Sequence, residues 1–240
     1  MSNPLYLIRH TRPAIAKGLC YGQSDIPLTK SFHKEAREVQ DRLARCVFSK
    51  VYTSPLQRCL LLSKELNLAA QSDSRLMEMN FGEWENQPWN TIFNSPDGKR
   101  WFEEYLTTPC PGGESFMDVL VRVESFLKDL NIIPKEQCAH VGNGEHEYPK
   151  GFESPYEPEY KSRQETDHEL SKAQHKNLAT GQNTGQAQKK GPYCLITHAG
   201  VIRAILVILC AQNPREVFDI AIPYGHIVTI TRNTFSLSSP

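Results

Sequence analysis

The chain has 240 residues, a length that suits one sizeable α/β domain. Its 27 lysines and arginines balance its 27 aspartates and glutamates, and the resulting net charge of zero argues against a nucleic-acid-binding or membrane-surface protein, which needs a basic surplus. Because no stretch reaches the roughly 20 apolar residues of a membrane span and the N-terminus lacks a signal-peptide pattern, we expect a cytoplasmic protein without membrane or nucleic-acid partners.

The seven cysteines form no CxxC pair, and several lie in apolar strand or helix patterns. Their number is odd, which does not suit a set of internal disulfides. We therefore expect buried reduced thiols and no structural zinc.

Two apolar segments each end in a histidine. Residues 5–8 run into Arg9 and His10, and residues 193–197 run into His198. Such short apolar runs are typical of buried parallel strands, whose carboxyl ends border the ligand site in open α/β sheets. One polar pair after a strand can simply be the start of a loop, but the repeated pattern predicts that the strands are neighbours and that the two histidines face each other.

The segment from Thr11 to Leu28 reads as a long loop with two glycines and two prolines, and loops of this length are usually functional. A helix follows, with Thr29 or Ser31 as its cap. Its apolar face consists of Phe32, Ala36, Val39 and Leu43. Residues 47–52 then read as the second strand.

Ser54, Pro55 and Gln57 together predict the start of a helix, with Ser54 as the N-cap. Arg58 falls in its first turn, where the macrodipole disfavours a cation. Either an anion binds here and stabilises the charge of Arg58, or the side chain of Arg58 is solvated and tolerates the unfavourable position.

Three glutamates, Glu78, Glu83 and Glu85, lie among large apolar residues. Apolar surroundings favour the protonated carboxyl group, which can then donate a proton. The alternative is that all three are surface residues, and for Glu83 and Glu85 we expect this.

Residues 109–115 predict a turn that contains Glu114, and Ser115 with Asp118 resembles a capping box. From Phe116 to Leu130 apolar residues recur at helical spacing, which predicts a core helix.

The composition turns polar from Lys135 to Gly191, with few aliphatic residues and no periodicity. We expect one domain spanning residues 1–240, with residues 135–191 as a flexible insertion. The spacing of its histidines at 140, 146, 168 and 175 does not suit a metal site. A buried helix from Gly200 to Cys210 and a strand over residues 227–231 complete the domain.

The candidate site combines His10, His198, Arg9, Arg58 and one carboxyl group. An imidazole nitrogen can attack phosphorus and form a phosphohistidine that water then cleaves. Fixed cations stabilise the charge on the transferring phosphoryl group, and a glutamic acid can protonate the leaving alkoxide. This chemistry needs no metal and no cofactor. We expect the protein to bind a small phosphorylated metabolite.

The same residues carry a family resemblance. The blocks are LIRH at 7–10, YGQSDIPL at 21–28, YTSPLQR at 52–58, FGEWE at 81–85 after Glu78, GES at 113–115 and THAGVIR at 197–203. In this order they resemble the phosphoglycerate mutase-like branch of the histidine phosphatase superfamily. The resemblance implies a three-layer α/β sandwich whose mostly parallel central sheet is flanked by helices. It also implies that His10 is the phosphorylated nucleophile, that Arg9, Arg58 and His198 surround the phosphoryl group, and that Glu78 is the proton donor.

Within the superfamily, RHTRP, CYGQSDIPL, FGEWENQPW and PCPGGES are most similar to the α-ribazole phosphatases of cobalamin assembly. Many family members carry glycine after the histidine, whereas this chain has Thr11, so we expect its phosphate pocket to be completed differently. The loop nearest the pocket suggests Thr11, Arg12, Tyr21 and Gln23 as substrate-binding residues.

Three other functions fit part of the pattern. A cofactor-dependent mutase would use the same histidine, but the loop after His10 lacks the tryptophan-containing pattern of mutases. A broad phosphatase of sugar or nucleotide phosphates remains compatible with every motif. A non-catalytic phospholigand-binding module would need the cations but not Glu78.

Overall fold

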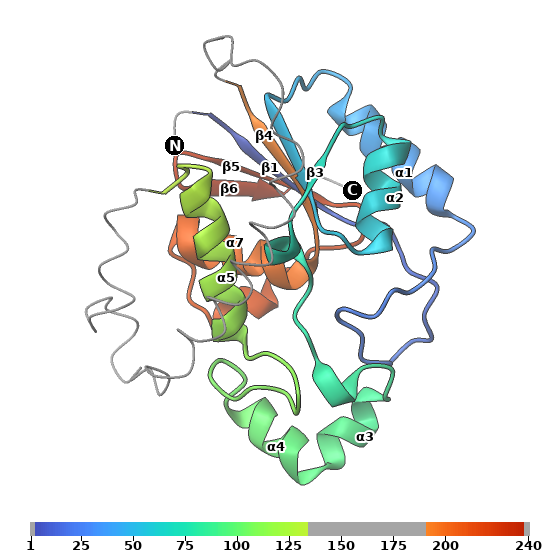
Figure 1. Ribbon diagram of the computed structural model, residues 1–240, viewed down its shortest axis with the longest axis vertical. Coiled ribbons are helices and arrows are strands. Elements are labelled where there is room, and N and C mark those ends of the chain that lie inside the picture. The colour runs from blue at the N-terminus through green and yellow to red at the C-terminus, as the bar shows by residue number, and fades with distance from the viewer. Residues whose placement is uncertain (1–2, 134–190, 238–240) are drawn as a thin grey trace, which may run out of the picture. The chain divides into compact units, whose positions relative to one another are not determined.

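The computed structural model describes residues 3–133 and 191–237 (Figure 1). The predicted insertion lies outside these residues except for Gly191, as do Cys138 and the four histidines at 140, 146, 168 and 175. The single domain over residues 1–240 therefore stays a prediction.

A six-stranded sheet forms the centre of the described part, in the order β3-β2-β4-β1-β5-β6. Its strands are β1 (Leu5–Arg9), β2 (Lys50–Thr53), β3 (Gln71–Ser72), β4 (Tyr193–Thr197), β5 (Ile227–Thr231) and β6 (Thr234–Leu237). Strands β1 to β4 are parallel, β5 is antiparallel to β1, and β6 is antiparallel to β5. Only β5 runs against the others, which confirms a mostly parallel sheet.

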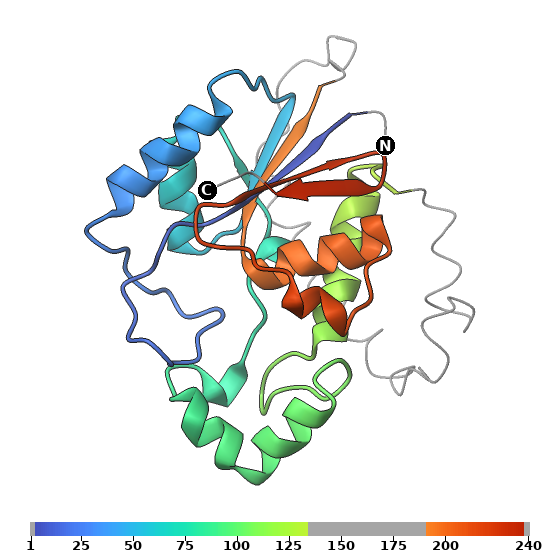
Figure 2. The same cartoon turned by 180° about the vertical axis from the view of Figure 1, so that it is seen from behind.

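Helices cover both faces of this sheet, which confirms the three-layer α/β fold (Figures 1 and 2). The helices are α1 (Phe32–Leu43), α2 (Gln57–Glu65), α3 (Trp89–Asn94), α4 (Pro96–Glu103), α5 (Phe116–Asp129) and α7 (Ala199–Cys210). Helices α1 and α2 pack on one face, and α5 and α7 pack together on the other. None of the helices in the described ranges is long and apolar enough to cross a membrane.

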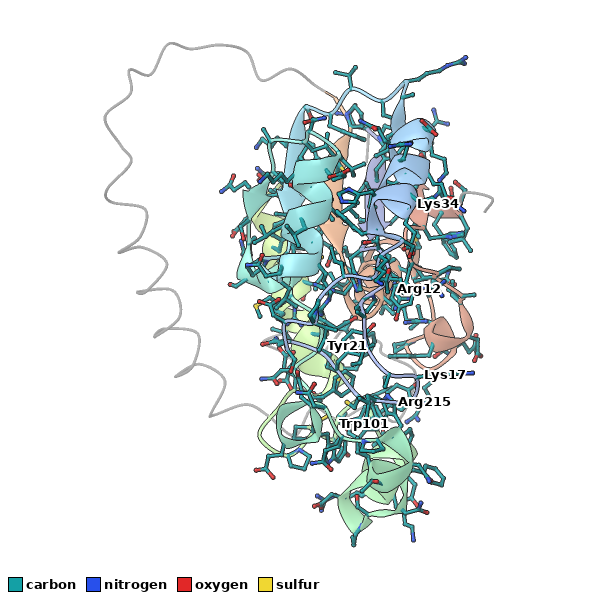
Figure 3. The ribbon with its side chains drawn as sticks, turned by 90° about the vertical axis from the view of Figure 1, so that its right-hand side faces the viewer. Arg12, Lys17, Tyr21, Lys34, Trp101 and Arg215 are labelled. Atoms are coloured by element: carbon teal, nitrogen blue, oxygen red, sulfur yellow. The ribbon has the colours of Figure 1, made fainter. Side chains whose placement is uncertain are left out.

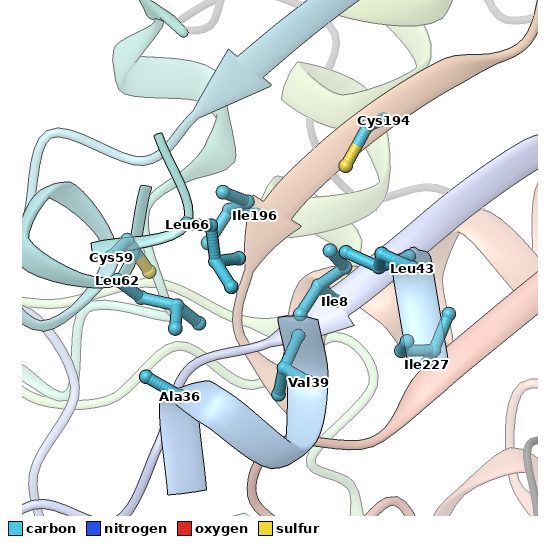
Figure 4. Packing of buried hydrophobic residues seen from close by; sticks show 10 residues of the cluster. All are labelled: Ile8, Ala36, Val39, Leu43, Cys59, Leu62, Leu66, Cys194, Ile196 and Ile227. Atoms are coloured by element: carbon cyan, nitrogen blue, oxygen red, sulfur yellow. The ribbon is translucent and has the colours of Figure 1, made fainter. Parts of the chain in front are cut away.

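The core beneath α1 and α2 explains the register of the central strands (Figure 4). Ile8 of β1 pairs with Ile196 of β4, and both side chains pack with Val39 of α1 and Leu62 of α2. Successive side chains of a strand point to opposite faces, so this register leaves the strand-end residues at one shared edge of the sheet.

Two predicted boundaries were wrong. Strand β2 begins at Lys50 rather than at residue 47, because pairing starts only where Lys50 meets Tyr193, and Val47 is exposed. Helix α2 begins at Gln57 with Leu56 as its N-cap, so Ser54 does not cap it. Strands β3 and β6 and the short helices α3 and α4 were not predicted.

Other local predictions were confirmed. Ser115 and Asp118 form the capping box of α5. Glu114 belongs to the preceding turn, where its carboxylate accepts from the backbone N–H of Asn80 and from Arg122. The six described cysteines are free, and Cys20, Cys59, Cys110 and Cys194 are buried.

Candidate active site

The parallel pairing of β1 and β4 brings the two histidines together. Arg9 pairs with Thr197, so His10 and His198 follow neighbouring strand ends. Their ring centroids lie 5.0 Å apart, and the exposed fractions of His10 and His198 are 1% and 0%. The sequence prediction that the two histidines face each other is confirmed.

The hydrogen bond of His10 defines its tautomer. Its Nδ1 lies 2.7 Å from the carbonyl oxygen of Thr11, and a carbonyl oxygen only accepts, so Nδ1 carries the proton. Burial, and then the charges of Arg58 and Arg9, lower the pKa of His10 well below its usual value. The ring is therefore neutral at pH 7, and its Nε2 has a free lone pair.

Arg58 is completely buried, so the alternative of a solvated arginine is wrong. Its guanidinium donates to the carbonyl oxygens of Gly22 and Ser24, and its Nε donates to Nδ1 of His198 at 3.3 Å. Nε2 of His198 lies 2.8 Å from Oγ of Ser54. Ser54 thus orients a site histidine, although the sequence suggested only a helix cap.

Arg9 lies on the other side of His10. One of its terminal nitrogens donates to the carbonyl oxygen of Ile222 at 2.5 Å, and the guanidinium lies 3.9 Å from the ring centroid of Tyr224. Its Nε is buried and has no hydrogen-bond partner in the described part of the chain. A buried donor without a partner is unfavourable until an acceptor binds.

Glu78 lies at the N-terminus of α7. Its Oε2 accepts from the backbone N–H of Gly200 at 3.3 Å, and its Oε1 accepts from the N–H of Met79. A Cβ atom on Gly200 would lie 2.3 Å from Oε1 of Glu78, so only glycine leaves room for this carboxyl group. Sequence spacing alone does not indicate this contact.

Two side chains hold the segment before Glu78 at the end of β4. Oγ1 of Thr197 donates to the carbonyl oxygen of Leu76 at 2.7 Å. Arg122 of α5 donates to the carbonyl oxygens of Arg75 and Glu78. These contacts place the carboxyl group beside the strand end that also carries His198.

Glu83 is exposed as expected, but the expectation of a surface position was wrong for Glu85. The carboxylate of Glu85 accepts from the backbone N–H groups of Gln23 and Ser24 and from the Ser24 hydroxyl. Burial acts to raise its pKa, but these hydrogen bonds outweigh burial and lower it. Glu85 therefore fixes the loop whose carbonyl groups hold Arg58.

The four predicted substrate-binding residues occupy different environments. Thr11 is buried, and its Oγ1 has no hydrogen-bond partner within the described ranges. Arg12 is exposed, whereas Nε2 of Gln23 donates to the carbonyl oxygen of Glu78. The hydroxyl of Tyr21 lies 2.7 Å from that of Tyr224. Tyr224 was not predicted as a site residue, and its only signal in the sequence is the Pro-Tyr-Gly turn before the last predicted strand.

The site has an excess of positive charge. Within residues 3–133 and 191–237, neither Arg9 nor Arg58 forms an ion pair. The same residues contain no group of three or more histidines, cysteines or carboxylates that could hold a metal ion. The two guanidinium groups without a carboxylate partner suit the site to an anion.

The family model described as "Histidine phosphatase superfamily (branch 1)" matches residues 5–146. The chain belongs to this superfamily. A relative from Hydrogenobacter thermophilus that is named for phosphoserine phosphatase activity is 32% identical over 147 residues, which cover 58% of this chain and 72% of the relative. Phosphoserine phosphatase 1 of the same bacterium is 29% identical over 133 residues, 52% of this chain and 63% of its own length.

Solved structures confirm the fold. The α-ribazole phosphatase of Shigella flexneri superposes with a TM-score of 0.64 at 19% identity, covering 98% of this chain and 94% of that one. A mycobacterial glucosyl-3-phosphoglycerate phosphatase superposes with a TM-score of 0.63 at 18% identity, and the match covers 95% of this chain and 89% of the mycobacterial chain. The protein is thus a phosphatase of the histidine phosphatase superfamily with the phosphoglycerate mutase-like fold.

Proposed function

We propose that this phosphatase hydrolyses small phosphomonoesters through a phosphohistidine formed on His10. The observation that carries the proposal is the state of His10, a buried neutral imidazole whose Nδ1 donates to a carbonyl oxygen and whose Nε2 makes no hydrogen bond within the described residues. A nucleophile needs this lone pair, and the neighbouring cations Arg9 and Arg58 neutralise the charge of the phosphoryl group.

The reaction proceeds in two steps. Nε2 of His10 attacks phosphorus, the ester P–O bond breaks, and Glu78 donates its proton to the leaving alkoxide. Water then attacks the phosphohistidine, the P–N bond breaks, and the Glu78 carboxylate takes up the proton from water. Phosphate and alcohol leave, and neither step requires a metal or a cofactor.

For the substrate we propose α-ribazole 5′-phosphate. Support comes from the blocks RHTRP, CYGQSDIPL, FGEWENQPW and PCPGGES, which resemble the α-ribazole phosphatases and the first of which contains Arg9 and His10. Phosphoserine is the second candidate, because the two relatives from Hydrogenobacter thermophilus are named for that activity.

The test is phosphate release from α-ribazole 5′-phosphate, phosphoserine and a panel of sugar and nucleotide monophosphates, with EDTA present throughout. A preference of at least about tenfold in kcat/KM for the ribazole ester supports the proposed substrate. A preference for phosphoserine supports the second candidate, and equal rates across the panel indicate a broad phosphatase.

The mechanism is tested separately with His10→Ala. Wild-type protein that is mixed with an ester labelled on phosphorus and then denatured at alkaline pH, where the P–N bond is stable, should contain a labelled phosphohistidine. His10→Ala should contain none, and its turnover should be nearly abolished. An undiminished rate in His10→Ala would contradict the mechanism. Phosphate binding without turnover in the wild type would instead indicate a phospholigand-binding module.

A further inference from the structure

Two tyrosines from distant parts of the chain, Tyr21 and Tyr224, contact each other near His10. Tyr21 belongs to the loop after β1, and Tyr224 belongs to the turn before β5. Because β5 runs antiparallel to β1, the residues before β5 lie at the sheet edge where β1 ends. The backbone N–H of Gly225 accordingly lies 3.2 Å from the carbonyl oxygens of both Arg9 and His10.

The two tyrosine rings lie against the cations of the site. The guanidinium of Arg9 lies 3.9 Å from the centroid of Tyr224, and that of Arg58 lies 5.5 Å from the centroid of Tyr21. The ring of His10 lies 5.5 Å from that of Tyr224. Both rings therefore adjoin the groups expected to hold the phosphoryl group.

The two tyrosine side chains are linked through their hydroxyl groups. The hydroxyls of Tyr21 and Tyr224 form one mutual hydrogen bond of 2.7 Å. Tyr21 also interacts electrostatically with Arg9 and with Glu78, the expected proton donor. Burial raises the pKa of Tyr21, so its hydroxyl keeps its proton. Figure 3 shows Tyr21 between Arg12 and the α3–α4 segment.

We propose that Tyr21 and Tyr224 form a leaving-group subsite that binds hydroxyl groups close to the ester oxygen, as in a phosphorylated sugar ring. This inference rests on the proposed function, because the phosphoryl group must lie on His10 for the ester oxygen to reach Glu78. The first atoms of the leaving group then lie beside the two tyrosine hydroxyls.

The hydrogen-bonding capacity of the pair supports a hydroxylated ligand. In their mutual bond one tyrosine donates and the other accepts, which leaves one hydrogen and several lone pairs available. A substrate hydroxyl can both accept this hydrogen and donate to a lone pair. A site built to hydrogen-bond a hydroxyl discriminates against an analogue that lacks it.

The test uses two esters that differ only in the groups the tyrosines would bind. Ribose 5-phosphate carries ring hydroxyls, and tetrahydrofurfuryl phosphate has the same ring without them. For each protein the measurement is the ratio of kcat/KM for the two esters. In Tyr21→Phe and Tyr224→Phe we expect this ratio to fall about tenfold, the equivalent of one lost hydrogen bond.

The phenylalanine variants keep the rings and their contacts with the arginines, and their free energy of unfolding should fall by no more than about 1 kcal/mol, the contribution of the hydrogen bond between the two hydroxyls. Tyr193→Phe is the matched control, because Tyr193 lies at the amino end of β4, whereas the site lies at the carboxyl end of that strand. The ratio for this variant should not change.

An unchanged ratio in both active variants overturns the subsite. An equal fall in kcat/KM for the two esters also overturns it, because the tyrosines would then act on His10 or Arg9 rather than on the leaving group. A wild-type protein that forms no phosphohistidine and hydrolyses neither ester overturns the proposed function itself.

Discussion

Arg58 donates from Nε to Nδ1 of His198, with 3.3 Å between the two nitrogens. Because Nδ1 accepts this hydrogen bond, the ring proton of neutral His198 is on Nε2, which lies 2.8 Å from Oγ of Ser54. A planar guanidinium is required to reach the carbonyl oxygens of Gly22 and Ser24 at the same time.

We therefore predict that Arg58→Lys lowers kcat/KM about a hundredfold, because an ammonium group cannot make these three contacts in the same place. Arg37→Lys, at an exposed position of α1, is the control and should leave the rate unchanged. A rate for Arg58→Lys within threefold of the wild type would contradict the role of the guanidinium geometry.

The contact between Gly200 and Glu78 predicts a dependence on the leaving group. In Gly200→Ala the new Cβ displaces the Glu78 carboxyl group, and Glu78→Gln removes its proton. Loss of a general acid costs roughly a hundredfold or more in kcat. Both variants should show this loss with alkyl phosphates and a much smaller loss with p-nitrophenyl phosphate, whose leaving group needs no proton.

Gly200→Ala should still fold, because alanine is favourable in the first turn of α7. Circular dichroism and thermal unfolding check this. Equal losses with both classes of ester would show that Glu78 is not the proton donor.

Glu85 provides a test of the loop that holds Arg58. We predict that Glu85→Gln lowers the free energy of unfolding by about 1–2 kcal/mol, because hydrogen bonds to a charged acceptor are lost. It should also lower kcat/KM about tenfold through the displaced carbonyl groups of Gly22 and Ser24. The control is Glu83→Gln, two residues away and exposed. Identical behaviour of the two variants in urea unfolding and kinetics would disprove the role of Glu85.

The buried histidines predict how stability depends on pH. Burial, then the electrostatic interaction with the His10 ring, and then the charge of Arg58 lower the pKa of His198. The pKa of His10 is shifted in the same direction, first by burial. The unfolded chain, with histidine pKa values of about 6.5, therefore binds more protons than the folded protein below that pH. The stabilisation is complete above about pH 6.5 and is lost as the pH falls toward the folded-state values.

We expect the free energy of unfolding to fall by up to about 1.4 kcal/mol per pH unit for each of the two histidines below pH 6.5. Urea unfolding between pH 7 and 5 measures this slope. His198→Asn should remove the part of this slope that comes from His198 and keep the part that comes from His10. A wild-type slope in His198→Asn would contradict the prediction.

Much of the fold could be predicted because the information is local. Apolar runs that end in His10 and His198 determine the strands, and the periodicity of residues 116–129 determines α5. These patterns depend on neighbours in the sequence, and the pairing of the two strands follows from their buried character. Strand β6 was not predicted because a short exposed strand lacks a strong pattern.

Other features were decided by the tertiary structure alone. Glu83 and Glu85 have similar sequence surroundings, yet only Glu85 faces the backbone of Gln23 and Ser24. The meeting of Tyr21 with Tyr224 depends on the antiparallel direction of β5. The sequence by itself determined which residue types reach the edge of the sheet. The tertiary structure decided which of these residues contact one another, because contacts between residues far apart in the sequence depend on how the helices and strands pack.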